Sequence, residues 1–191
     1  MPNTKDFILA SGSPQRKALL ENIGYIPKAV ITADIDETPN KYEKPTAYVK
    51  RMALEKAQAV SSKNPNENIL AADTILAIGT HIVQKAKDAE EQAQVMRMMS
   101  GKAHKVLTAV CLIGKTGKIS LRLNSNKVIV KKMTEAEIQE YIATNEWVGS
   151  AGYKIEGAAQ FTVKKIIGSY SGIVGLPLYE TKNMLVGVGI K

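Results

Sequence analysis

The sequence predicts a mixed α/β fold in which helices pack around one sheet. Short apolar runs, typical of buried strands, are interspersed with segments whose apolar residues recur at helical spacing. Because strands and helices do not alternate strictly, a purely parallel sheet is not expected. The 191 residues, 45% of them hydrophobic and 23% charged, suit one substantial core, so we expect a single domain over residues 1–191.

Turn and capping residues mark the elements near the N-terminus. Residues 7–11 are predicted to form an apolar strand. A helix opens next, because Ser13 is a favoured N-cap residue and Pro14 suits the first helical position. Gly24 ends this helix. Residues 30–35 are predicted to form a second strand, which a turn containing proline follows.

A longer helix and a buried strand come next. Residues 46–61 place their apolar side chains on one helical face. Residues 69–72 are uniformly apolar, and we expect this strand to end at Asp73 and Thr74, with residues 75–78 after it. An acidic residue would then lie at the carboxyl end of a buried strand, where ligands of α/β proteins gather.

The C-terminal half combines two long strands with helices. Residues 88–99 have a helical pattern, and residues 105–113 and 119–132 are predicted strands joined by a turn that contains glycine. Thr134, with a glutamate three residues later, forms a capping box that opens another helix. Strands and loops follow, and a short helix at residues 178–186 is the last predicted element.

Composition limits the classes of partner. No apolar run approaches the roughly 20 residues of a membrane span, and the polar N-terminus does not resemble a signal peptide, so we expect a cytoplasmic protein with no membrane partner. The single cysteine, Cys111, lies in an apolar strand and is expected to be a buried hydrophobe. The net charge of +8 favours anionic partners, although a solvated basic face without a ligand explains it equally well.

Several segments carry groups that could bind phosphate or metal. The strand–loop–helix junction from Ser11 to Lys17 offers free N–H groups, hydroxyls and the charge of Arg16, but it lacks the P-loop spacing. Asp73 could hold Mg²⁺ or accept a proton from water. Each also has an ordinary structural explanation, as a capped helix start and as a turn residue.

Other charged residues are ambiguous when they are taken singly. Asp34, Asp36 and Glu37 place three carboxylates within four residues, which suits a metal or a solvated acidic loop. Lys56 and Lys85 could each pair with phosphate or be plain surface lysines.

The combination of motifs is more specific than any one of them. In order along the chain come Ser-x-Ser-Pro-x-Arg-Lys, Asp-Glu-Thr-Pro, Arg-x-Ala-x-Glu-Lys-Ala, Ala-Ala-Asp-Thr and Gly-Leu-Pro-Leu-x-Glu-Thr. This order resembles the Maf family, also called septum formation inhibitor proteins, from Ile8 to Leu185. The resemblance implies a Maf/ITPase-like fold of two lobes with a central cleft. It also implies a nucleoside triphosphate pyrophosphatase that needs a divalent cation, Mg²⁺ or Mn²⁺.

The resemblance further implies a set of active-site residues. They are Ser11, Arg16, Glu37, Lys56, Asp73 and Lys85. The serine and the arginine would hold phosphate oxygens, and the two lysines would neutralise the triphosphate. Glu37 and Asp73 would bind the metal, and Asp73 would be the base that activates water for attack on the α-phosphorus.

Three positions of the family bear on the choice of base. The subgroup that acts on dTTP and UTP favours Arg, Thr and Gln, whereas the subgroup that acts on 7-methyl-GTP tends toward a trio that includes Glu. Here Gln15 stands where many members have Arg, Thr74 agrees with the first subgroup, and Glu156 agrees with the second. The sequence therefore leaves the base open.

The main hypothesis is a house-cleaning enzyme whose partner is a nucleoside triphosphate, and two other functions compete with it. The family name allows a division-inhibiting interaction protein that acts by binding rather than by catalysis. A nucleic-acid-binding module would use the basic charge, but no recognition motif accompanies it and few aromatic residues are available for stacking, so no nucleic acid is expected. A homodimer is compatible with the sequence.

Overall fold

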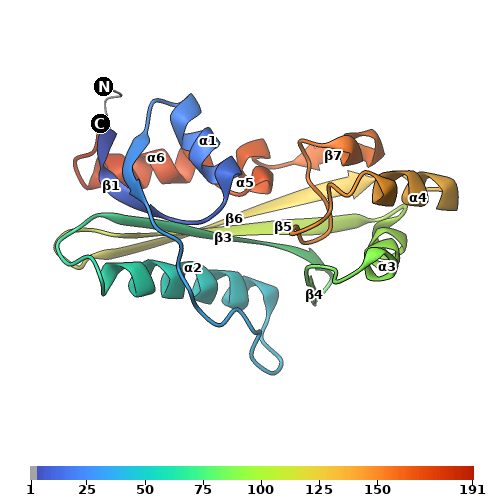
Figure 1. Cartoon of the computed structure of the whole chain (residues 1–191), viewed down its shortest axis with the longest axis horizontal. Coiled ribbons are helices and arrows are strands. Elements are labelled where there is room, and N and C mark those ends of the chain that lie inside the picture. The colour runs from blue at the N-terminus through green and yellow to red at the C-terminus, as the bar shows by residue number, and fades with distance from the viewer. Residues whose placement is uncertain (1–3) are drawn as a thin grey trace.

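Three long strands run through both lobes of the molecule (Figure 1). The computed structural model describes residues 4–191, and its sheet is built around β3 (Ile69–Ile78), β5 (Ala103–Ile113) and β6 (Ile119–Val130). Antiparallel pairing joins β3 to β5 and β5 to β6 in continuous register. One sheet therefore supports the whole of the described chain.

Shorter strands complete a seven-stranded mixed sheet. Its order is β2-β1-β3-β5-β6-β7, and β4 also pairs with β3. The added strands are β1 (Thr4–Ala10), β2 (Ile26–Val30), β4 (His81–Val83) and β7 (Val163–Ile167). Only β1 makes parallel pairs, one with β2 and one with β3. The predicted mixed sheet flanked by helices is confirmed.

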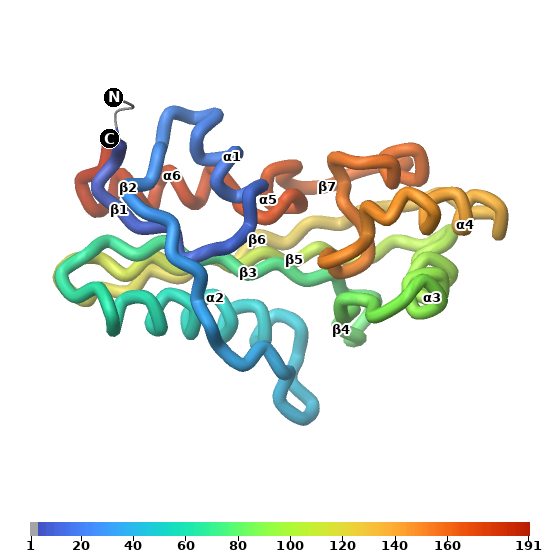
Figure 2. The backbone as a smooth tube through the Cα atoms, viewed as in Figure 1, coloured from blue at the N-terminus to red at the C-terminus, as the bar shows by residue number. Residues whose placement is uncertain are grey.

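Helices cover both faces of the sheet (Figures 1 and 2). In the lobe that contains β1 and β2, α2 (Pro45–Ser61) lies on one face of the sheet, and α1 (Pro14–Asn22) and α6 (Leu178–Gly187) lie on the other. The remaining helices are α3 (Ala89–Met99), α4 (Glu135–Ala143), the short α5 (Tyr170–Val174) and a 3₁₀ turn (Ala158–Thr162). Within residues 4–191, none of these helices has the length and apolar character that crossing a membrane requires.

The alternation of side chains along β3 explains this layering. Ala71 and Ile75 point to the face that packs against α2, whereas Leu70 and Ala72 point to the face covered by α1 and α6. Cys111 on β5 is fully buried in the α2 layer, as predicted. A separate apolar cluster fills the second lobe around α3 and α4.

Two predicted strands differ from the structure. The strand predicted at residues 30–35 is wrong, because β2 occupies Ile26–Val30 and residues 31–35 form no strand. The predicted end of a strand at Asp73 and Thr74 is also wrong, since β3 continues through both residues. Pairing with β5 from Ile69 to Ala77 outweighs the weak strand preference of an aspartate.

The short strands leave part of one edge of β3 open. Pairing with β1 ends at Ala71, and pairing with β4 begins at Leu76. Among residues 4–191, no strand pairs with this edge of β3 between these two positions, and Asp73 and Thr74 lie there. The two lobes therefore part along the middle of a continuous strand.

Candidate active site

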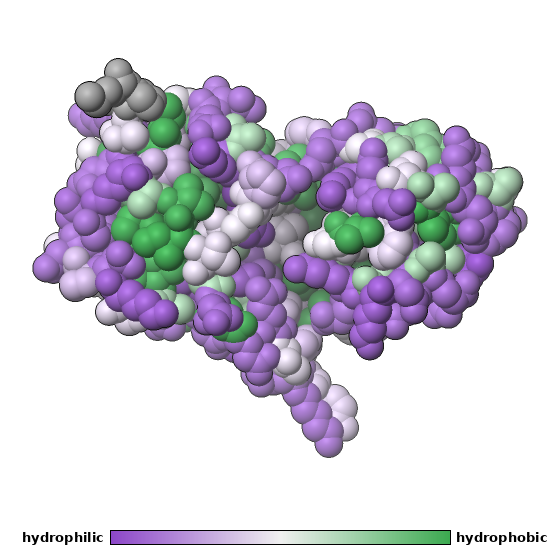
Figure 3. Space-filling model, in the orientation of Figure 1, coloured by the Kyte–Doolittle hydropathy of each residue, from purple (hydrophilic) through white to green (hydrophobic). Residues whose placement is uncertain are grey.

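A cleft of about 540 Å³ opens beside this unpaired edge of β3. Figure 3 shows the molecule hollowed between its two lobes. All of the site residues predicted from the sequence line this cleft: Ser11, Gln15, Arg16, Glu37, Lys56, Asp73, Thr74, Lys85 and Glu156. Residues separated by as much as 145 positions in the sequence thus share one hollow, and their roles there remain predictions.

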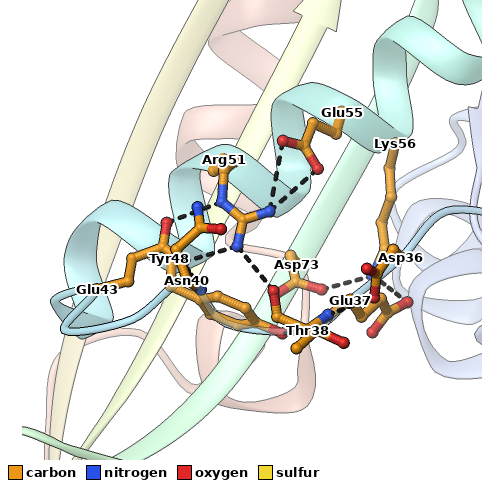
Figure 4. Close-up of polar contacts among 10 residues, drawn as sticks. All are labelled: Asp36, Glu37, Thr38, Asn40, Glu43, Tyr48, Arg51, Glu55, Lys56 and Asp73. Atoms are coloured by element: carbon orange, nitrogen blue, oxygen red, sulfur yellow. Dashed lines mark hydrogen bonds and ion pairs between the residues drawn. The ribbon is translucent and has the colours of Figure 1, made fainter.

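Two carboxylates meet one ammonium group on the α2 side of the cleft (Figure 4). Lys56 Nζ lies 2.6 Å from Asp73 Oδ1 and 2.9 Å from Glu37 Oε1. The side chains of Lys56 and Asp73 are 12% and 9% exposed, whereas that of Glu37 is 47% exposed. The lysine therefore holds an inner and an outer carboxylate side by side at the wall of the cleft.

The loop that carries Glu37 is fixed by two residues of α2 that the sequence analysis missed (Figure 4). Tyr48 donates its hydroxyl proton to the carbonyl oxygen of Glu37 at 2.7 Å, and burial raises the pKa of Tyr48 to about 12. Arg51 donates to both carboxylate oxygens of Glu43 and to the carbonyl of Thr38, and it lowers the pKa of Glu43. For Arg51 the sequence did offer a signal, because this arginine is the first residue of the motif Arg-x-Ala-x-Glu-Lys-Ala.

The three acidic residues of the loop do not converge. Glu37 lines the cleft, but Asp36 accepts a hydrogen bond from the backbone N–H of Thr38 at 2.9 Å, and Asp34 is exposed outside the cleft. Within residues 4–191, no group of three or more His, Cys, Asp or Glu side chains is arranged to hold a metal ion. Of the acidic side chains on this side of the cleft, only Glu37 and Asp73 line it among residues 4–191.

Arg16 occupies the other side of the cleft, where the side chain of Thr74 points. Its Nε donates to the carbonyl of Gly175 at 2.9 Å, Nη1 to Ser11 Oγ at 3.1 Å and Nη2 to Thr74 Oγ1 at 3.3 Å. Desolvation lowers the pKa of Arg16, and the negative charges of Asp73 and Glu37 oppose this shift. Three of the five guanidinium N–H groups are thus engaged with the protein, which leaves two for a ligand.

Helix α1 begins at the cleft, as predicted, but Ser13 does not cap it in the predicted way. Ser13 occupies the N-cap position and Pro14 the first turn, yet the Ser13 side chain makes no capping bond. Its hydroxyl donates instead to Gln15 Oε1 at 3.1 Å. The first-turn N–H groups therefore have no side-chain acceptor from Ser13, which suits an anionic ligand.

The second lobe supplies the remaining wall. Lys85 is exposed between β4 and α3, and Glu156 is exposed before the 3₁₀ turn. Neither side chain forms an ion pair within residues 4–191. These two charges face the cleft from the lobe opposite α2.

A buried histidine contacts one of the residues that line this wall of the cleft. His104 is 3% exposed, and its Nε2 lies 2.8 Å from the hydroxyl of Tyr153, which lines the cleft. Burial lowers the pKa of His104 from 6.5 to about 4. The imidazole is therefore neutral in the folded protein at physiological pH.

The His104 pKa predicts a pH-dependent stability. Its folded pKa lies below its unfolded value, so the unfolded chain binds more protons and stability is lost as the pH falls below about 6.5. We expect the free energy of unfolding to drop by about 2 kcal/mol between pH 7 and pH 5. Urea denaturation at both pH values should show that His104→Gln removes most of this drop, whereas His81→Gln, at an exposed position, keeps it. Equal drops in both variants would contradict the assignment.

Comparisons with known proteins agree on the family. The family model of the Maf-like protein matches residues 6–188. The dTTP/UTP pyrophosphatase of Hyphomonas neptunium is 45% identical over 100% of both chains. The enzymes of the same name from Zymomonas mobilis and Caulobacter vibrioides are 45% and 43% identical and are covered over 91% and 96% of their lengths, with 95% and 96% of this chain aligned.

Solved structures with weaker similarity were also found. The nucleoside-triphosphatase (dITP/XTP pyrophosphatase) of Mycobacterium abscessus gives a TM-score of 0.46 at 18% identity, over 66% of this chain and 74% of that one. The Ham1 protein of Staphylococcus aureus gives 0.47 at 13% identity, over 65% and 71%. The family match and the curated relatives span nearly the whole sequence, and the chain belongs to the Maf-like protein family.

Proposed function

We propose that this chain hydrolyses nucleoside triphosphates to the monophosphate and diphosphate. The observation that carries the proposal is the meeting of Asp73, Glu37 and Lys56 in a cleft that also holds Arg16. The carboxylates of Asp73 and Glu37, which could bind a metal and accept a proton from water, lie on one side of the cleft. The guanidinium of Arg16, which has N–H groups free to bind a ligand, lies on the other side. The curated relatives, which are named dTTP/UTP pyrophosphatases, support this reaction and do not favour a division inhibitor that acts by binding alone.

Each of the cleft residues has a separate role in the proposed hydrolysis. Asp73 takes a proton from water, whose oxygen bonds to the α-phosphorus as the bond from that phosphorus to the bridging oxygen breaks and diphosphate leaves. Arg16 and the start of α1 hold phosphate oxygens, and Lys56 and Lys85 offset the negative charge that the phosphates carry. No bond forms between the enzyme and the phosphate.

A divalent cation fits the two carboxylates. Glu37 and Asp73 both contact Lys56 Nζ, so the two carboxylates already share one cationic group, and carboxylate oxygens are the ligands that Mg²⁺ and Mn²⁺ accept. Mg²⁺ commonly binds one or two carboxylates together with phosphates of its substrate. When bound, the metal would neutralise charge on the triphosphate.

The preferred base follows from the relatives and from one side chain. Thr74 agrees with an enzyme for dTTP and UTP, and we propose this class of substrate, together with clearance of non-standard pyrimidine nucleotides. Gln15 and Glu156 differ from that subgroup and are expected to modify the preference. A cytoplasmic location and a homodimer remain predictions.

A triphosphate panel tests the proposal. The purified protein is incubated with Mg²⁺ or Mn²⁺ and with dTTP, UTP, CTP, GTP, 7-methyl-GTP and modified pyrimidine triphosphates, and diphosphate and phosphate are measured separately. Diphosphate with a monophosphate product, highest for dTTP and UTP, is expected. Release of phosphate alone would contradict attack at the α-phosphorus. The absence of product from every substrate would refute the proposed enzymatic activity.

A further inference from the structure

Polar side chains form a row across the middle of the sheet, on the face that α1 and α6 cover. Thr74 on β3 lies opposite Thr108 on β5, which in turn lies opposite Asn124 on β6. Asn126 follows two residues later on β6 and therefore shares this face. Thr108 and Asn126 are 0% and 1% exposed. Buried polar groups cost free energy unless they are hydrogen-bonded, so the partners of this row show what it holds.

Both ends of the Asn126 amide make hydrogen bonds. Its Oδ1 accepts from the backbone N–H of Ser169 at 2.6 Å, and its Nδ2 donates to Asn124 Oδ1 at 2.7 Å and to the carbonyl of Val106 at 3.3 Å. Ser169 is the N-cap of α5, because its Oγ accepts from the N–H of Gly172 at 3.2 Å. Asn126 therefore holds the residue at which α5 begins.

The backbone around the start of α5 packs directly against the two asparagines. A Cβ at Gly168 would collide with Asn126 Oδ1, and a Cβ at Gly172 would collide with Asn124 Oδ1. Gly168 also has a φ of +131°, which side-chain-bearing residues rarely adopt. Thr108 adds a third contact, because it donates to the carbonyl of Gly172 at 2.7 Å. The polar row thus fixes α5 relative to the sheet.

The far end of α5 carries the carbonyl that holds Arg16. Gly175 is the C-cap of α5, and its N–H donates to the carbonyl of Ser171 at 3.1 Å. The Gly175 carbonyl accepts from Arg16 Nε at 2.9 Å. On the other side of Gly175, Asn124 Nδ2 donates to Glu180 Oε1 in the first turn of α6 at 2.8 Å. The asparagine pair therefore holds both helices that flank Gly175 in the sequence.

We propose that Asn126 is a positioning residue for Arg16. Apolar packing has no preferred direction, whereas the amide fixes the N–H of Ser169 along one line and so sets where α5 presents the carbonyl of Gly175. Asn126 is not among the residues of 4–191 that line the cleft, so it acts on a ligand only through its neighbours. This inference rests on the proposed function, because it requires a triphosphate beside Arg16.

Binding of two phosphate-bearing probes tests the inference. The probes are the α,β-imido analogue of UTP and inorganic tripolyphosphate, titrated by calorimetry in the presence of Mg²⁺. Asn126→Ala should weaken both about tenfold, because the proposed partner of Arg16 is phosphate and not the base. Asn68→Ala is the matched control. Asn68 is 4% exposed, and its amide joins the carbonyl of Asp6 to the N–H of Lys115 outside the cleft, so both affinities should stay unchanged.

A double mutant separates positioning from a general loss of stability. In an Arg16→Ala background, Asn126→Ala should weaken either probe by less than about twofold. In turnover of UTP, Asn126→Ala alone should raise KM about tenfold and leave kcat within about threefold, since Arg16 binds phosphate both before and during the reaction. If Asn126→Ala does not fold, Ser169→Ala replaces it, because it removes the hydroxyl that caps α5 and leaves the amide in place.

Four outcomes would overturn the inference. They are unchanged affinities in the folded variant, equal losses in Asn68→Ala, a further tenfold loss in the Arg16→Ala background, and no binding of either probe to the wild type. Diphosphate release from UTP is measured separately. A wild type that binds both probes, with the expected differences among the variants, but releases no diphosphate would refute the proposed function and leave the positioning role of Asn126 supported.

Discussion

Replacing Asp73 with asparagine is expected to lower kcat about a thousandfold while the chain stays folded. An amide cannot take the proton of the attacking water, and it is a poorer metal ligand than a carboxylate. The fold should tolerate the change because asparagine has nearly the same shape and Lys56 keeps its contact with Glu37 at 2.9 Å. Diphosphate release at saturating UTP gives kcat, and thermal unfolding reports the fold.

A neighbouring carboxylate provides the matched control. Asp34 lies in the same acidic loop as Glu37 but is exposed and outside the cleft, so Asp34→Asn should leave kcat unchanged. The pair of variants separates a specific base from a general loss of negative charge near the site. Near-normal turnover by Asp73→Asn would exclude Asp73 as the base, and a large loss in Asp34→Asn would mean that the loop carries a function that its geometry does not indicate.

Motifs in the sequence predicted which residues line the cleft better than they predicted the strands and contacts that hold those residues. Asp73, Lys56 and Arg16 were each ambiguous when taken singly, and the ordered set of motifs that resembles the Maf family placed them in one site. The break predicted at Asp73 was wrong because strand pairing is non-local. The order of the apolar residues around Asp73 does not reveal that β5 pairs with it throughout.

The supporting contacts could not be predicted for the same reason. Thr108 lies behind Thr74 only because β3 and β5 pair in one particular register, and a shift of one residue would place it on the other face. Arg51 opens the motif Arg-x-Ala-x-Glu-Lys-Ala, but the sequence alone does not reveal that its side chain contacts Glu43 and the carbonyl of Thr38. The identities of the cleft residues can therefore be read from motifs, whereas the contacts that hold those residues depend on the fold.

Replacing Lys56 with methionine should impair both stability and turnover. Methionine fills a similar volume but leaves Asp73, whose side chain is 9% exposed, without its ion-pair partner and close to Glu37. We expect a loss of about 2 to 3 kcal/mol in the free energy of unfolding, less than for a fully buried pair because Glu37 is in contact with water. The value of kcat should fall about a hundredfold, since a charge that faces the phosphates is lost.

An exposed ion pair serves as the control, because it shows whether any loss of stability comes from the buried position of Lys56 or from the removal of a positive charge alone. Lys17 pairs with Glu21 at 3.5 Å on the surface of α1, and Lys17→Met should cost less than about 0.5 kcal/mol. Urea denaturation compares the two variants, and diphosphate release with UTP gives their activities. If Lys56→Met is as stable as the wild type, Glu37 and Asp73 do not depend on the lysine to remain side by side. If it is destabilised but fully active, Lys56 holds the carboxylates without contributing to catalysis.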